Sequence, residues 1–95
     1  MVEQLAASNL ERIIPDLRRR LRRIVGQAQG IERMLTEQRD CGEVVNQVAA
    51  LKAAVEQVGV TLVSCLLEGA IRDAVKQGEE SSDAVVYAKR LLGRI

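Results

Sequence analysis

The strongest constraint on the fold is an apolar repeat, with alternating spacings of three and four, that runs through most of the chain. This period is typical of helices packed along a seam, and no alternating apolar and polar pattern of the kind found in strands occurs. The repeat therefore predicts an all-α chain. Its first series is Leu17, Leu21, Ile24, Ala28, Ile31 and Leu35, and its second is Cys41, Val44, Val48, Leu51, Val55, Val58, Leu62 and Cys65.

Local signals divide the chain into three helices at about 15–37, 41–77 and 82–93. Pro15 suits the first turn of a helix, so we expect residues 1–14 to form a loosely ordered arm before a single domain over 15–95. Asp40 is a good N-cap, and Glu43 can reach back to it in a capping box. Gly78 offers a stop for the long second helix.

The length of the second helix predicts association with other chains. A helix over 41–77 would span about 55 Å, which is longer than a compact chain of this size requires. The 95 residues include no Trp or Phe and one Tyr, so the core that a single copy can bury is limited. We therefore expect an assembly of several copies.

The N-terminal sequence and the distribution of apolar residues predict a cytoplasmic protein with no membrane contact. Met1-Val2-Glu3-Gln4 lacks the basic start and apolar stretch of a signal peptide. No uninterrupted apolar run approaches the roughly 20 residues that cross a bilayer. In a reducing compartment, the two cysteines are expected to be thiols rather than a permanent disulfide.

A cluster of arginines is the first feature that indicates a binding partner. No acid interrupts the cluster, although the net charge of the chain is only +1. Guanidinium groups along a rigid helix suit phosphate oxygens, and the absence of interleaved aromatic side chains favours duplex DNA over a single strand. The alternative is a solvated charged face. The candidate DNA-binding residues are Arg18, Arg19, Arg20, Arg22 and Arg23, together with Lys52 on the second helix.

The two cysteines are 24 positions apart on one predicted helix, hence about 36 Å apart and unable to meet within one subunit. Antiparallel packing of two copies about an axis near Ala53 and Ala54 would bring Cys41 of one chain toward Cys65 of the other. The alternative is that both are buried seam residues. For Cys41, the amide dipoles of a helix N-terminus favour the reactive thiolate.

Several segments together resemble the copper-sensitive operon repressor family, which includes nickel-, formaldehyde- and sulfide-responsive members. The resemblance covers about residues 15–92 and implies a three-helix subunit, an antiparallel dimer, a tetramer built as a dimer of dimers, and release of DNA on effector binding. It also implies that Cys41 is the sensing cysteine and that Arg20 contacts DNA. The segments are Arg20-Leu21-Arg22-Arg23-Ile24, Gly26-Gln27, Gly30-Ile31, Arg33-Met34, Cys41 and Gln47-Val48-Ala49-Ala50.

The chain departs from the family's usual effector sites. Where the copper sensors carry a His and a second Cys, this sequence has Leu66 and Ala70, and it contains no His at all. The N-terminal Pro of the formaldehyde chemistry is also missing at position 2. Cys65 lies one residue before the missing His, whereas the second cysteine of the sulfide-responsive branch aligns with Ala70. Cys65 therefore matches that branch by chemistry and not by position.

The leading hypothesis is a tetrameric repressor that releases double-stranded operator DNA when reactive sulfur or an oxidant modifies Cys41 and Cys65 across the dimer. Cu(I) held by the same two thiolates is a second possibility, because soft thiolates suit Cu(I); no other cofactor is expected. From another class, the chain could be a structural helical module with inert cysteines. An enzyme is disfavoured because no His can act as general base and no Gly-rich phosphate loop occurs.

Overall fold

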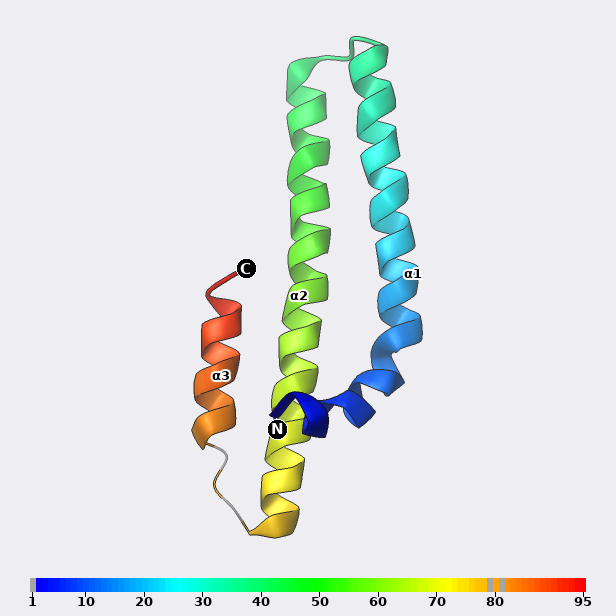
Figure 1. Cartoon of the computed structure of the whole chain (residues 1–95). Coiled ribbons are helices and arrows are strands. Elements are labelled where there is room, and N and C mark those ends of the chain that lie inside the picture. Colours follow the sequence, from blue (N-terminus) through cyan, green and yellow to red (C-terminus); the bar gives the residue numbers. More distant parts are fainter. Residues whose placement is uncertain (1, 79, 81) are drawn as a thin grey trace. The chain divides into compact units, whose positions relative to one another are not determined.

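The structure is a computed structural model that describes residues 2–78, 80 and 82–95, with side chains from residue 10 onward. It contains three helices, α1 (Val2–Thr36), α2 (Cys41–Gln77) and α3 (Ser82–Leu92), as Figure 1 shows. Because no strand occurs among these described residues, the all-α prediction with a long second helix is confirmed. The bounds of α2 are those expected, and α3 ends one residue early.

The start of α1 differs from the prediction. The helix begins at Val2 and continues through Pro15, whereas we expected it to begin at Pro15. A proline inside a helix removes one backbone donor, so the ladder loses one hydrogen bond there. The half-buried Leu10 and Ile13 continue the helical period on the N-terminal side of Pro15. The expected looseness of residues 1–14 stays a prediction.

The chain divides into two compact units, and both boundaries fall inside helices. Residues 16–58 form one unit, here called the hairpin unit. Residues 1–15 and 59–95 form the other, here called the terminal unit. The boundaries lie next to Pro15, which lacks a backbone donor, and Gly59, which lacks a side chain.

In the hairpin unit, α1 and α2 run antiparallel and are joined by a short turn (Figure 1). The amide of Arg39 donates to the carbonyl of Met34 over 3.0 Å, and Gln38 takes a left-handed backbone with φ 56°. The amide of Glu43 donates to Asp40 Oδ2 over 3.3 Å, so Asp40 is the expected N-cap of α2.

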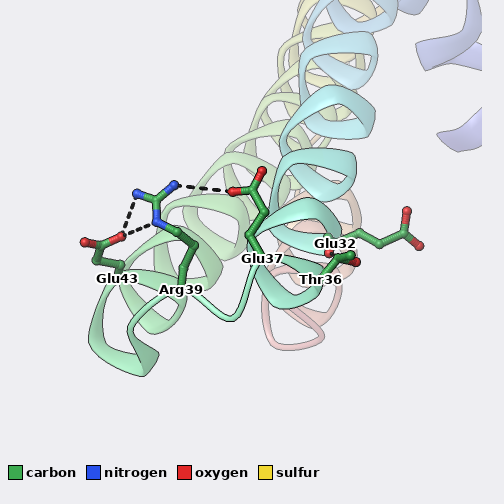
Figure 2. Close-up of polar contacts among 5 residues, drawn as sticks. All are labelled: Glu32, Thr36, Glu37, Arg39 and Glu43. Carbon is green, nitrogen blue, oxygen red and sulfur yellow. Dashed lines mark hydrogen bonds and ion pairs between the residues drawn. The ribbon is translucent and has the colours of Figure 1, made fainter.

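Glu43 binds a side chain instead of returning to the Asp40 amide. Its Oε2 accepts hydrogen bonds from Arg39 Nη2 at 2.7 Å and Nε at 3.1 Å. Figure 2 shows the Arg39 guanidinium between Glu43 and Glu37, whose Oε2 lies 3.8 Å from Nη1. The carboxylate that we expected to complete a capping box therefore binds the turn that precedes the cap.

Replacing Asp40 with Ala is expected to lower the free energy of unfolding by about 1 kcal/mol, because the first turn of α2 loses its capping acceptor. Asp40→Asn keeps a side-chain oxygen at the same place and should retain most of that stability. Denaturant unfolding followed by circular dichroism measures both variants. Equal losses for Ala and Asn would show that the negative charge, and not the cap, stabilises this end of α2.

Packing inside the hairpin unit follows the predicted seam of α1 at Leu17, Ile24 and Ile31 and departs from it at the seam positions that alternate with them. Leu17 is buried, but Leu21 and Leu35 of the predicted seam are 47% and 62% exposed. The less exposed positions also alternate by three and four from Leu17, but every second position lies one residue earlier than in the predicted seam. This contact stripe consists of Leu17, Arg20, Ile24, Gln27, Ile31 and Met34 on α1, with Val44, Leu51, Ala54 and Val58 on α2.

The apolar residues left outside the contact stripe form a second face. At about 100° per residue, those of α1 lie about a quarter turn from its contact stripe, and those of α2 do the same. Because the helices are antiparallel, both sets lie on one side of the hairpin. This exposed apolar face consists of Leu21, Val25 and Leu35 on α1 with Val45, Val48 and Val55 on α2.

The terminal unit is packed mainly with small side chains. Ala84 and Ala88 of α3 are buried, as are Ala70 and Ala74 of α2. A Cβ placed on Gly59 would lie 2.7 Å from the Cδ1 of Ile95, so the glycine accommodates that isoleucine side chain. The buried surface of this unit therefore depends on close approach of backbones.

Helix α2 is long and apolar enough to cross a membrane by length and composition alone. Scattered Val and Leu residues raise the mean hydropathy of α2 without forming an uninterrupted apolar run, so the expectation of no membrane contact stays a prediction. Only 17% of the apolar window is buried in one copy of the chain. Along α2, Val48 and Val55 of the exposed apolar face are about half exposed.

Candidate functional site

The arginine cluster lies on α1 just after the boundary of the hairpin unit. Four of its side chains are exposed, and Arg20 is partly covered. Three and four residues bring helical side chains to the same face, so the cluster covers a broad strip on both sides of Arg19. The exposed members are Arg18, Arg19, Arg22 and Arg23.

Asp16 supplies a carboxylate directly before the cluster. Its Oδ1 accepts a hydrogen bond from Arg19 Nη2 at 2.5 Å, and its Oδ2 lies 2.9 Å from Arg20 Nε. Among the residues that the structure describes, no carboxylate forms an ion pair with the other three arginines of the cluster. The uninterrupted run of arginines is thus partly neutralised at its N-terminal end.

A groove of about 900 Å³ opens between the two helices of the hairpin unit, beside the cluster. Arg20 and Gln27, which are about two helical turns apart on α1, both line this groove. We had not expected Arg23 or Gln57 there, because only the register of α2 against α1 determines which residues meet. The groove is lined by Arg20, Arg23, Ile24, Gly26 and Gln27 of α1 and by Ala54 and Gln57 of α2.

Lys52 is on α2 in the same unit but does not line the groove. Its side chain is 76% exposed, and its Nζ lies 3.9 Å from Glu56 Oε1. An exposed pair at this separation contributes little to stability. The lysine is therefore available to an external anion, and its role in DNA binding stays a prediction.

The two cysteines occupy contrasting environments. Cys41 is the first residue of α2 and is exposed, whereas Cys65 is 5% exposed, and neither forms a disulfide. They belong to different units, Cys41 to the hairpin unit and Cys65 to the terminal unit. An exposed thiol is accessible to a reagent or a soft metal, and a buried one is not.

The donor set for a metal is small. Among the described residues, no group of three His, Cys, Asp or Glu side chains is placed to hold a metal ion. Leu66 is partly buried and Ala70 is buried, and neither side chain carries a donor atom. The soft donors that the described residues offer are the thiols of Cys41 and Cys65 and the thioether of Met34.

Comparison with known proteins gives one family. The profile of the metal-sensitive transcriptional repressors matches residues 14–91. The chain is 35% identical over 65 residues to the copper-sensing transcriptional repressor RicR of Mycobacterium tuberculosis, covering 68% of both chains. It is 35% identical over 60 residues to the copper-sensing transcriptional repressor CsoR of Bacillus subtilis, covering 63% of this chain and 59% of that one.

A further relative is the uncharacterized protein YrkD of Bacillus subtilis, which is 36% identical over 59 residues. The matched region covers 62% of this chain and 94% of that relative. No solved structure matches the chain.

Proposed function

Because the chain belongs to the metal-sensitive transcriptional repressor family, we propose that it binds double-stranded operator DNA through its arginine cluster and releases it when an effector reaches Cys41. Membership in this family of regulators means that the chain is not an enzyme. A repressor of this kind acts where the DNA is, so we place it in the cytoplasm.

The arginine cluster carries the proposal for DNA. Five guanidinium groups lie within six positions of one helix, and four of them are exposed. Forked donors on a rigid helix match phosphate oxygens, and the release of condensed counterions makes such contacts favourable. A protein that binds a polyanion needs such a concentration of exposed positive charge. A purely structural helical module does not.

The exposed apolar face supports assembly with a second copy. Leu21 and Val25 on α1 and Val48 and Val55 on α2 are each about half exposed in one chain. An apolar face of this kind marks an interaction site, and a two-fold axis lets the same face cover itself. We propose an antiparallel dimer through α1 and α2, with two dimers forming a tetramer. If a second copy covers this face, the apolar character of α2 is explained by contact between chains, and no membrane is needed to explain it.

We propose that sensing begins at Cys41, since its thiol is exposed and Cys65 is not. With a polysulfide as oxidant, the Cys41 thiolate attacks a sulfur atom, forms a persulfide and releases a polysulfide shortened by one sulfur. The Cys65 thiol of the neighbouring chain then attacks the inner sulfur of the persulfide, forms a disulfide and releases hydrogen sulfide.

Burial of Cys65 supplies the coupling to DNA. A disulfide needs the two sulfur atoms within bonding distance, so a buried Cys65 reacts only if the helices around it repack. A coupling of about 1 to 3 kcal/mol between this repacking and DNA binding makes a useful switch.

Cu(I) is the second candidate effector, favoured by the copper-sensing relatives. The thiolates of Cys41 and the neighbouring chain's Cys65 would hold it as two soft ligands. When bound, the metal supplies a link between two chains. The positions of Leu66 and Ala70 contribute no donor to such a site.

Replacing Cys41 with Ala should abolish the effector response while leaving the DNA affinity of the untreated protein unchanged within about twofold, because the thiol makes no DNA contact in this proposal. Fluorescence anisotropy with the duplex upstream of the chain's own gene measures the affinity of reduced protein. The measurement is repeated after addition of Cu(I), polysulfide or formaldehyde separately. Cys65→Ala should block the disulfide but still permit the Cys41 persulfide.

The effectors are separated by the adducts that they leave on the protein. Polysulfide should weaken DNA binding and add one sulfur atom or a crosslink to Cys41 in the mass spectrum, whereas Cu(I) should leave the thiols unmodified. An unmodified Cys41 after polysulfide treatment contradicts the sulfur proposal. If no effector changes the affinity of the wild-type protein, sensing itself is wrong.

A further inference from the structure

The groove between the two helices of the hairpin unit combines positive charge with neutral hydrogen-bond donors. Arg20 and Arg23 contribute guanidinium groups, and Gln27 and Gln57 contribute carboxamides. No carboxylate lines it among the described residues, and Cys41 does not line it either. We propose that this groove binds one phosphate-class oxyanion, and that Arg20 and Arg23 thereby act differently from the other arginines of the cluster.

The chemistry of the lining matches a tetrahedral dianion. Guanidinium forks donate paired hydrogen bonds to phosphate oxygens, and the amide groups of glutamine donate further ones. Ile24 and Ala54 provide apolar wall between these donors, which strengthens the electrostatic attraction inside the groove. Asp16 holds the Nε of Arg20 at 2.9 Å, so this guanidinium is positioned before a ligand arrives.

The groove has an open rim at Gly26. A Cβ placed on this glycine would meet nothing within 4 Å, so the position can carry a side chain without a clash. Any residue larger than glycine adds atoms where an anion would enter. Gly26 is therefore both a feature of the groove and a site at which it can be blocked with little effect on packing.

Assembly through the exposed apolar face leaves the groove uncovered. Arg23 and Gln57 each lie about a quarter turn from the contact stripe of their helix, on the side opposite to Leu21 and Val48. A second copy that covers the apolar residues thus approaches the other side of the hairpin. The groove stays accessible to an anion in the proposed dimer.

The oxyanion has two possible sources, a phosphate of the DNA backbone or free inorganic phosphate. The first source rests on the proposed DNA-binding function, and the second does not. If both reach the same groove, free phosphate competes with DNA for Arg20 and Arg23. The intracellular phosphate level would then set part of the affinity of the repressor for its operator.

The test titrates inorganic phosphate into the full chain at constant ionic strength, with amide chemical shifts as the readout. Shifts should concentrate at Gly26, Gln27 and Gln57. Gly26→Glu adds a carboxylate at the rim and should weaken binding about tenfold or more, while Gly26→Gln has the same shape without charge and serves as the control. Arg23→Gln should weaken binding similarly, and the double variant of Arg18→Gln with Arg22→Gln should not.

A second measurement identifies the source. If free phosphate causes no shifts, but Gly26→Glu lowers DNA affinity relative to Gly26→Gln and Arg23→Gln lowers the salt slope by about one, the oxyanion is a DNA phosphate. If neither phosphate shifts nor DNA affinity distinguish Gly26→Glu from Gly26→Gln, the groove proposal is overturned. Wild-type DNA affinity in the Arg18 and Arg22 double variant would contradict the proposed function, and the phosphate titration would still decide on the groove.

Discussion

Replacing Arg18 and Arg22 together with Gln is expected to lower the affinity for operator DNA on the order of 100-fold at physiological salt. Both side chains are exposed, and neither forms an ion pair with a carboxylate of the described residues. Each phosphate contact that is lost reduces counterion release, and an assembly multiplies the loss by the number of chains on the DNA. The slope of log affinity against log salt should therefore decrease by about one for each lost contact.

The matched control removes the same charge elsewhere. Lys76 and Lys89 are exposed residues of the terminal unit, so replacing both with Gln lowers the net charge equally. This control should keep the affinity within a few-fold of the wild-type value, because neither lysine belongs to the proposed DNA-binding residues. Equal losses in the two double variants would mean that only net charge matters. No loss in either would favour the structural module with inert cysteines.

Introducing Asp at both Val48 and Val55 is expected to dissociate the assembly. In one chain these residues are 47% and 50% exposed, and in the proposed dimer they are covered by the second copy. Burying an unpaired carboxylate costs several kcal/mol, which is comparable to the stability of a small domain. Sedimentation velocity should show a single chain, and circular dichroism should show a lower melting temperature.

Asn46→Asp is the control for charge on α2, because this position lies about half a turn away from Val48. It should leave the sedimentation coefficient unchanged. If the variant with Asp at Val48 and Val55 keeps the mass of the wild-type assembly, the exposed apolar face is not the interface between copies.

The helices were predictable from the sequence because their signals are local. The period of three and four, the cap at Asp40 and the left-handed stop at Gly78 each depend on a few neighbouring residues, and the structure has α2 at the expected bounds. The continuation of α1 through Pro15 was not predictable from a rule about proline alone. A proline disfavours a helix interior by about 3 kcal/mol, and the apolar period on both sides of it outweighs that penalty.

The packing within the hairpin was less predictable, because two apolar stripes share each helix. Periodicity identifies which residues recur, but it does not tell whether Leu17 and Ile24 face the same neighbour as Leu21. The register of α2 against α1 decides which stripe is buried between the helices, and this register depends on residues far apart in the sequence. The arginine cluster was evident because its members are neighbours in the sequence. The presence of Arg23 and Gln57 in one groove was not evident, because it depends on the register between two helices.

The position of Asp16 has a consequence for the proposed binding of DNA. Its two oxygen atoms hold Arg19 and Arg20 in the same way that a phosphate would, so the chain carries an internal competitor for nucleic acid. Any DNA that engages these two arginines through the same donors must first displace that carboxylate. Because an exposed ion pair is worth little, this exchange costs every DNA sequence about the same small amount, and the discrimination between sequences is left to other contacts.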